Sequence, residues 1–369
     1  MFEIIRRRHC RIDVQNRDIG AELSGEARLN PDRMAPPLQV LENIEKHVTA
    51  IPAQQKAAAT QEPVMLMRYD NDARHQLTPW LPSPLPLSGS NQSMPDFPGL
   101  QRVCMTNHWD SYHRHWKLLD APLRPTPETV GIVERELDLG NADVLLLGVT
   151  PELAVLGRSM LAIDQSAAMI SGVWAGDNTS RRAMAGNWLD LPVERECFDA
   201  VIGDGCLSAV DTKAARGSLF GEIARVLKPG RRAAIRVFAR PETADDLRGI
   251  EALVLAGGIE NFHALKWRIA MACTTGDCDS SVDVQAIRAA FDKLFPDREA
   301  LAARTGWSMA SINTIDVYAG SETRYSFATL AMLEDEARDW FDQVRVVPSG
   351  SYPLAERCPL LVLGSAKLR

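Results

Sequence analysis

The sequence predicts an α/β fold built on a doubly wound, mostly parallel sheet of seven strands that ends in an antiparallel hairpin. The first observation is an alternation of short apolar stretches with helical patterns over residues 143–238, which is typical of parallel strands joined by crossover helices. The second is a closing pair of apolar stretches, QVRVVPSG and CPLLVLGSA, separated only by SYPLAER. A parallel crossover needs about a dozen residues or more, so this pair is expected to be antiparallel.

Five apolar stretches are the expected parallel strands, and they cover residues 143–147, 161–164, 183–187, 198–203 and 232–238. Right-handed crossovers between them place helices on both faces of the sheet. One helix is expected to begin at Pro127 with Thr126 as its N-cap, because threonine caps well and proline suits the first helical position. The same signals predict a second helix that begins at Pro151 with Thr150 as its N-cap.

The composition indicates a soluble globular protein. The chain has 369 residues, of which 46% are apolar and 24% charged, and a formal net charge of −7. This acidic balance argues against a nucleic-acid partner, and no apolar run approaches the roughly 20 residues that span a bilayer. Seven scattered cysteines indicate free thiols in a reducing cytoplasm. Neither a membrane partner nor a metal site is expected.

The first part of the chain reads differently from the rest. Prolines recur from about residue 61 among Ser, Asn and Gln, and each proline removes a backbone donor and disfavours helix before it. Residues 1–100 are therefore expected to be a weakly folded N-terminal extension. Residues 101–369 are expected to form the folded domain, with a mostly helical insertion at about residues 257–323.

Ligands of open α/β sheets bind beyond the carboxyl ends of the strands, so the residues that follow each strand are the candidate site. Gly148 follows the first strand and allows the backbone to turn tightly. Asp164 ends the second, where a carboxylate suits the paired hydroxyls of a ribose. A plain strand-to-helix turn at Gly148 and a helix N-cap at Asp164 remain open as structural alternatives.

The third and fourth strands add further candidates. After the third, Asp190 is chosen as the acceptor for an exocyclic adenine amine, with Trp188 or Leu189 covering the ring. After the fourth, Asp204 stands between two glycines that permit a close approach, and it is a candidate to hold an ammonium group or orient a substrate.

Four segments carry a resemblance to a known family. VLLLGVTPEL, AIDQSAAMI, GNWLDLPVERECFDAVIGDGCL and EIARVLKPGRRAAIRVF resemble, in this order, the successive motifs of class I S-adenosylmethionine-dependent methyltransferases. The resemblance covers about residues 108–365 and implies a Rossmann-like fold, S-adenosyl-L-methionine as cofactor, and methylation of an acceptor. It implies that Gly148 and its loop face the methionine portion, Asp164 the ribose and Leu189 with Asp190 the adenine. Asp204 is placed beside the sulfonium.

The glycine loop departs from the family pattern. Family members commonly show E/D-x-G-x-G-x-G here, whereas Leu146, Gly148, Thr150 and Glu152 occupy the four defined positions of this chain. The usual contact to the methionine amino group is therefore altered, and Glu152 or Asp204 is expected to replace it.

The acceptor side is inferred from aromatic residues and histidines. The aromatic segment before the first strand places Trp109, Tyr112, His113 and Trp116 on one face at helical spacing, either as an acceptor wall or as a stripe packed on the core. His113 is the first choice for a general base and His263 the second. Arg324 with Tyr325 is expected to edge the acceptor site.

The acceptor is expected to be a small molecule, since GDGC after the fourth strand is unlike the Asn/Asp-Pro-Pro-aromatic motif of enzymes that methylate nucleic-acid bases. An O-, N- or C-nucleophile and the oligomeric state are left open. Two other classes remain as alternatives. One is an NAD(P)-dependent oxidoreductase, although the chain lacks G-x-G-x-x-G after the first strand. The other is a degenerate, non-catalytic nucleotide-binding or scaffold protein.

Overall fold

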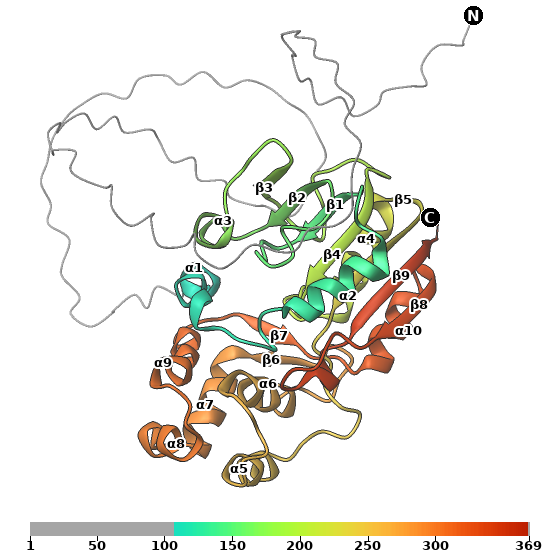
Figure 1. The fold of residues 1–369 in the computed structure, drawn as a ribbon. Helices are drawn as coiled ribbons and strands as arrows, with labels where there is room; N and C mark the ends of the chain where they lie inside the picture. The colour runs from blue at the N-terminus through green and yellow to red at the C-terminus, as the bar shows by residue number, and fades with distance from the viewer. Residues whose placement is uncertain (1–106, 368–369) are drawn as a thin grey trace, which may run out of the picture. The chain divides into compact units, whose positions relative to one another are not determined.

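The computed structural model describes residues 107–367, and a seven-stranded sheet of order β3-β2-β1-β4-β5-β9-β8 forms its centre (Figure 1). This confirms the predicted fold class. The expectations for residues 1–100 lie outside the residues that the structure describes. The strands of the main sheet are β1 (Asp143–Leu147), β2 (Ser159–Asp164), β3 (Arg181–Ala185), β4 (Phe198–Asp204), β5 (Leu227–Arg236), β8 (Phe341–Val347) and β9 (Leu360–Ala366).

The sheet is parallel from β3 to β5 and antiparallel at its other end. β1 pairs in parallel with β2 and β4, whereas β9 pairs antiparallel with β5 and β8, as the short loop between the last two strands predicts. Alternate residues of β1 belong to opposite cores, with Val144 and Leu146 on one face and Leu145 and Leu147 on the other. Burial on both faces explains why these strands are apolar throughout.

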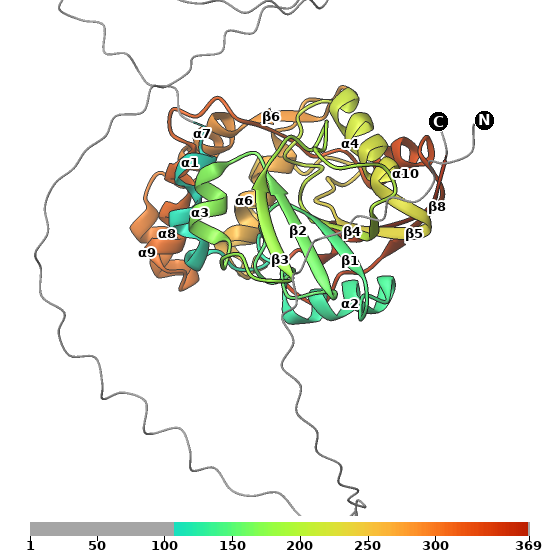
Figure 2. The same cartoon turned by 90° about the horizontal axis from the view of Figure 1, so that it is seen from above.

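Helices cover both faces of this sheet. Figure 2 shows α2 on one face and α4 with α10 on the other. The α-helices are α1 (Trp109–Tyr112), α2 (Pro127–Leu137), α3 (Ala167–Val173), α4 (Lys213–Val226), α5 (Leu247–Leu255), α6 (Phe262–Ala272), α7 (Val284–Leu294), α8 (Arg298–Thr305), α9 (Met309–Ile312) and α10 (Leu330–Arg338). Short 3₁₀ helices are η1 (His113–Leu118), η2 (Asn313–Tyr318) and η3 (Ala355–Arg357).

The start of α2 agrees with the sequence. Thr126 is its N-cap, its hydroxyl accepts the backbone N–H of Thr129, and Pro127 occupies the first helical position. The Thr129 side chain in turn bonds the backbone N–H of Thr126, which completes a capping box. Such a cap stabilises a helix end by about 1 kcal/mol.

The helix predicted from Pro151 is absent, and this prediction is wrong. Residues 151–155 form consecutive turns, in which the Thr150 carbonyl accepts the N–H groups of Leu153 and Ala154. The chain then reverses at Gly157, whose φ is +73°, and β2 begins at Ser159. The stretch is too short for two helical turns, so no extended helix N-terminus faces the strand ends here.

Several strand boundaries also differ from the prediction. β2 begins at Ser159 rather than 161, and β4 ends at Asp204 rather than 203. β3 begins at Arg181 rather than 183, because it is the edge strand and its outer residues need no apolar pattern. β5 includes the LKPG turn segment and begins at Leu227, which pairs with Phe198 across a register shift.

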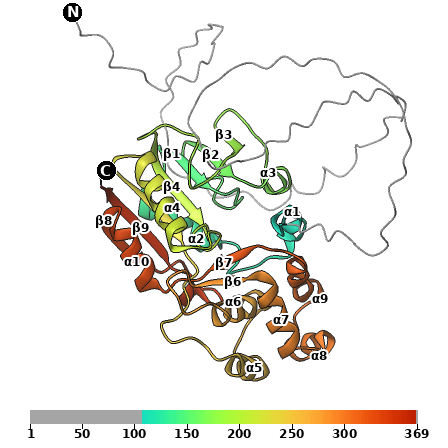
Figure 3. The same cartoon turned by 180° about the vertical axis from the view of Figure 1, so that it is seen from behind.

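A helical group, α5 to α9, lies between β5 and β8 in the chain and carries a second, two-stranded sheet. Its strands, β6 (Ser281–Asp283) and β7 (Arg324–Ser326), pair antiparallel and are too short to predict from pattern. Figures 1 and 3 both show α1 between α3 and this helical group. Within residues 107–367, none of the helices has the length and apolar character needed to cross a bilayer.

Candidate functional site

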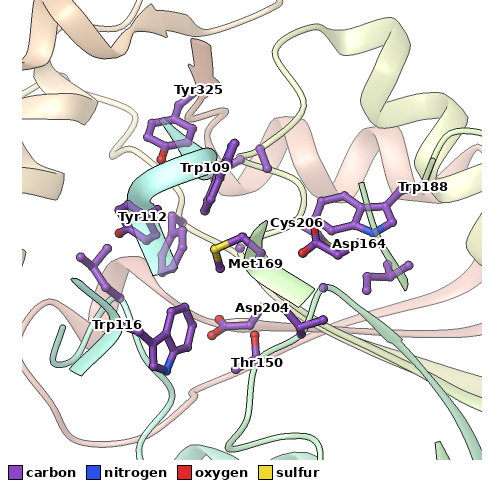
Figure 4. A pocket seen from close by; sticks show the side chains of 18 of the residues that line it. Trp109, Tyr112, Trp116, Thr150, Asp164, Met169, Trp188, Asp204, Cys206 and Tyr325 are labelled. Atoms are coloured by element: carbon purple, nitrogen blue, oxygen red, sulfur yellow. The ribbon is translucent and has the colours of Figure 1, made fainter. Parts of the chain in front are cut away.

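A cavity opens where the strand order reverses, between β1 and β4. Gly148 follows β1, Asp164 ends β2, and Asp204 ends β4, and all three line the cavity. This is the place where open α/β sheets bind ligands. In Figure 4, Asp164 and Trp188 lie on one side of the cavity, and the aromatic rings of Trp109, Tyr112, Trp116 and Tyr325 gather on the other.

The two carboxylate oxygens of Asp164 differ in their hydrogen bonding. Its Oδ1 accepts the backbone N–H of Ser166 at 2.8 Å, and Oδ2 accepts no hydrogen bond from the residues that the structure describes. The N-cap of α3 is Ser166, whose hydroxyl accepts the N–H of Met169, so the N-cap alternative for Asp164 is wrong. Burial raises the pKa of Asp164 to about 6. A buried carboxylate with a free oxygen is suited to hydroxyl donors.

Gly148 and Trp188 shape a slot beside that carboxylate. Gly148 has φ of +99°, where glycine alone is unstrained, and its N–H donates to the Ile163 carbonyl at 2.8 Å. The Trp188 indole N–H donates to the same carbonyl at 2.6 Å. A Cβ on Gly148 would lie 3.8 Å from both Asp164 Oδ2 and the Trp188 ring, so glycine keeps the slot between them open.

The predicted adenine contacts require a correction. Leu189 and Asp190 do not line the cavity, and Trp188 does. A bridge between Asn187 and Asp190 turns the chain back, which leaves Asp190 exposed and directs Leu189 toward the core on the α4 face of the sheet. The loop after β3 therefore reaches the cavity through Trp188 and not through the two side chains that the sequence predicts.

In the loop after β1, too, only some of the predicted residues line the cavity. Thr150 lines the cavity, whereas Glu152 does not, because it is drawn into an ion pair with Arg124. Glu152 Oε2 is buried without a hydrogen-bond partner in the described part of the chain. Asp204 lines the cavity and receives two hydrogen bonds from Arg236, at 2.5 and 2.9 Å.

The opposite side of the cavity is an aromatic wall, which we define as Trp109, Tyr112, Trp116, Trp267 and Tyr325. Its rings meet edge to face: the ring centres of Trp109 and Tyr112 lie 5.1 Å apart, and those of Trp267 and Tyr325 lie 5.5 Å apart. Such pairs favour a fixed geometry beyond simple area burial. The wall joins α1 and η1 to α6 and β7.

Two buried polar contacts hold Tyr325 in this wall. The His108 Nε2 atom lies 2.7 Å from the Tyr325 hydroxyl, which ties the start of α1 to β7. Arg216, fully buried in α4, donates to Ser326 Oγ at 2.6 Å and pairs with Glu336 at 2.7 Å. These bonds fix the small sheet against the main one.

Both predicted general bases lie outside the cavity lining. His263 is buried, and its Nε2 lies 2.9 Å from the Leu118 carbonyl, so it connects α6 to the end of η1. Burial, together with Lys266, lowers the pKa of His263 to about 3. His113 packs against α3, where a Cβ on Gly172 would lie 2.5 Å from its ring. Both histidines therefore have packing roles in this structure.

Arg324 is also misplaced by the prediction. Its side chain donates to Ser281 Oγ at 2.6 Å and pairs with Asp283 at 3.2 Å, away from the cavity. Neighbouring residues of a strand point to opposite faces, so Arg324 and Tyr325 of β7 cannot share the acceptor side. Tyr325, Trp109 and Tyr112 line the cavity.

No local sequence pattern marks the lining residues Met169, Phe238 and Trp267. Trp116 follows Tyr112 by four residues, and this helical spacing places it on the predicted aromatic face. Trp267 comes from a helix far along the chain, and no local motif marks it. Cys206 also lines the cavity, and burial raises its pKa to about 12, so its thiol stays protonated.

Comparisons with known proteins bear on residues around this site. Residues 138–235 match the family model for a methyltransferase domain. Among curated proteins, none matches this chain. Solved structures match as well, all at low identity.

Three solved structures illustrate that likeness. A Rhodobacter sphaeroides protein described as a zinc-dependent alcohol dehydrogenase is 12% identical and covers 70% of this chain and 98% of its own, with a TM-score of 0.45. The N-methyltransferase NodS of Bradyrhizobium japonicum WM9, in complex with S-adenosyl-L-homocysteine, is 12% identical over 70% of this chain and 99% of its own, with a TM-score of 0.39. A SAM-dependent methyltransferase of Methanosarcina mazei is 16% identical over 63% and 96%, with a TM-score of 0.35.

Proposed function

Because the chain belongs to the class I S-adenosylmethionine-dependent methyltransferases, we propose that it methylates a small-molecule acceptor bound against the aromatic wall. The enclosure of that wall carries the proposal. Tyr112, Trp267 and Tyr325 are each at most 4% exposed, so an acceptor must enter a buried space to reach them. Enclosed, mostly apolar pockets with a few polar groups are typical of small-molecule sites.

S-adenosyl-L-methionine is the cofactor, and the residues at the strand ends fit its nucleoside. The fit rests on the free oxygen of Asp164 and on the slot that Gly148 leaves between Asp164 and Trp188. We propose that Asp164 Oδ2 accepts the ribose hydroxyls and that the Trp188 indole covers the nucleoside beside it. The role given to Leu189 and Asp190 passes to Trp188.

We propose that Thr150 and Asp204 face the methionine end. Both line the cavity, and both Asp204 oxygens are already paired with Arg236. Glu152 lies close enough to Asp204 to raise its pKa, and we propose that these two carboxylates act electrostatically on the ammonium group. Arg236 pairs with Asp204 and Arg124 with Glu152.

When bound, S-adenosyl-L-methionine supplies an activated methyl group on a positively charged sulfur. The chain's own residues then have to bind and orient the acceptor and to exclude water. The aromatic wall does both, because its edge-to-face rings fix a shape and leave little room for solvent. Aromatic faces also attract a nearby cation, which suits a sulfonium.

We further propose that residues 101–369 form the methyltransferase domain and that its helical insertion, at about residues 257–323, builds the acceptor side. Support comes from Trp267, which lies on α6 in that segment and lines the cavity. Tyr325 follows directly after the segment, on β7.

A methyl-label experiment tests the acceptor class. The protein is incubated with S-adenosyl-L-methionine labelled in its methyl group and with two fractions of a cell extract, one cleared of macromolecules and one containing only macromolecules. We expect label to appear in new small molecules of the first fraction. Label that accumulates only in protein or nucleic acid would overturn the small-molecule proposal.

The labelling experiment and calorimetry together test the two alternatives. A non-catalytic scaffold transfers no label in either fraction. For an NAD(P)-dependent oxidoreductase, calorimetry would show binding of NADH and none of S-adenosylhomocysteine. The methyltransferase family match favours the opposite result.

A further inference from the structure

A buried lysine lies against the aromatic wall. Lys266 of α6 is fully buried, and its Nζ has no hydrogen-bond or ion-pair partner within residues 107–367. Three rings surround the ammonium group, with Nζ at 5.3 Å from the ring centre of Tyr318, 5.6 Å from that of Trp267 and 5.8 Å from that of Tyr112. Trp267 and Tyr112 line the cavity, and Lys266 itself does not, so the cation lies against two of the rings that form the cavity wall.

The same side of the cavity is rich in unused donors. The indole N–H groups of Trp116 and Trp267 are buried without acceptors in the described chain, and both residues line the cavity. Buried polar groups are normally satisfied. Donors that converge on one wall without an acceptor are suited to a ligand that supplies oxygen lone pairs.

None of the titratable groups around Lys266 in the described residues can act as its counter-ion. Its titratable neighbours are His108 and His263, which each interact electrostatically with it, and the tyrosines at positions 112 and 318. Burial alone lowers the pKa of Lys266 to about 7, and no carboxylate among the described residues opposes this. The amine is therefore close to losing its proton while the pocket is empty.

We propose that the acceptor is a small aromatic oxyanion, a carboxylate or phenolate, whose negative charge is paired across the wall by Lys266. This inference rests on the proposed function, since it names the acceptor of the same site. An anion in the cavity favours the charged form of the amine, so binding takes up a proton at a pH above the resting pKa. Lys266 touches no reacting atom in this scheme and acts as a positioning residue.

The test uses calorimetry on protein saturated with S-adenosylhomocysteine. Benzoate and 4-nitrophenolate are the anionic probes, and benzamide is the neutral counterpart of benzoate. At about pH 8, in buffers of different ionisation enthalpy, we expect an anionic probe to bind with uptake of close to one proton and benzamide to bind with none. Whichever anion binds tighter distinguishes a carboxylate from a phenolate acceptor.

Two variants make the result specific. Lys266→Met is expected to weaken binding of the anionic probes at least tenfold and to abolish proton uptake, while S-adenosylhomocysteine binding stays within about twofold. Lys293→Met on α7, where the lysine is exposed, is the matched control and should behave as wild type. Unfolding curves confirm that each variant folds.

Equal affinity of wild type and Lys266→Met for the anions, binding without proton uptake, or no binding of either anion would each overturn the inference. Failure of the proposed function is seen separately, as label found only in macromolecules. The two failures are therefore distinguishable.

Discussion

Two buried cations flank the same cavity, and they differ in one respect. Arg236, on the cofactor side, is paired with both oxygens of Asp204. Lys266, on the acceptor side, has no partner among the residues described. A paired buried charge is costly to disturb, whereas an unpaired one already lowers the stability of the fold. The comparison teaches that the buried cation on the cofactor side is paired within the fold, whereas the buried cation on the acceptor side has no counter-ion among the residues described.

Breaking the ion pair between Arg236 and Asp204 should have the largest effect on the free energy of unfolding. Arg236→Met leaves Asp204 buried without its cation, and we expect the free energy of unfolding to fall by about 3–5 kcal/mol. Urea-induced unfolding measures this. Arg231→Met is the control, because Arg231 is mostly exposed and its loss should cost less than about 1 kcal/mol. A loss for Arg236→Met as small as that of the control would contradict the comparison.

Removing the unpaired cation should have the opposite sign. The folded-state pKa of Lys266 is about 7, against 10.5 for an ordinary lysine. Below about pH 7 the cost of burying the ammonium is fully present, and it disappears as the pH rises toward 10.5. We expect Lys266→Met to stabilise the protein by on the order of 3 kcal/mol at neutral pH.

The pH dependence is the sharper readout for Lys266. Between about pH 7 and 10.5, the wild type should gain stability relative to Lys266→Met, because its unfolded chain binds the extra proton. Unfolding curves across this range measure the difference. A constant difference between the two proteins would show that the lysine keeps its usual pKa.

These contrasts bear on what the sequence can predict. Gly148 and Asp164 are predictable because the alternation of strands and helices gives the position of each strand end, and strand ends are where such folds bind ligands. Lys266, His108 and Trp267 are not predictable in the same way. They come from segments far apart in the sequence, and no local spacing shows that α1, α6 and β7 meet.

Other predictions named side chains that do not line the cavity, and the local backbone explains why. Trp188 rather than Leu189 lines the cavity, because the Asn187–Asp190 bridge decides which side chain of the loop points inward. His113 and His263 are the right type of residue for a base, yet their backbone positions direct them into packing contacts. A sequence gives the type of each residue, but it does not give the direction in which the side chain points.

On the cofactor side, Asp164 should control affinity. Asp164→Asn keeps the shape and removes the charge, and we expect S-adenosylhomocysteine to bind more weakly by about 1–3 kcal/mol. Because burial raises the pKa of Asp164 to about 6, wild-type affinity should fall as the pH drops below 6, and the variant should not follow. Calorimetry from about pH 5 to 8 tests both statements. Affinity independent of pH in the wild type would contradict the ribose role.

The smallest effect is expected at Asp190. This side chain is exposed and does not line the cavity, so Asp190→Asn should change S-adenosylhomocysteine affinity by less than about twofold. The same titration at neutral pH measures it. A loss comparable to that of Asp164→Asn would restore Asp190 as an adenine contact and displace Trp188 from that role.

The close approach of Gly172 to His113 links the two sides mechanically. The N-cap of α3 is Ser166, whose backbone N–H donates to Asp164, and near the other end of the helix Gly172 abuts the His113 ring of η1. One short helix therefore connects the carboxylate at the end of β2 with the segment that carries Trp116 of the aromatic wall.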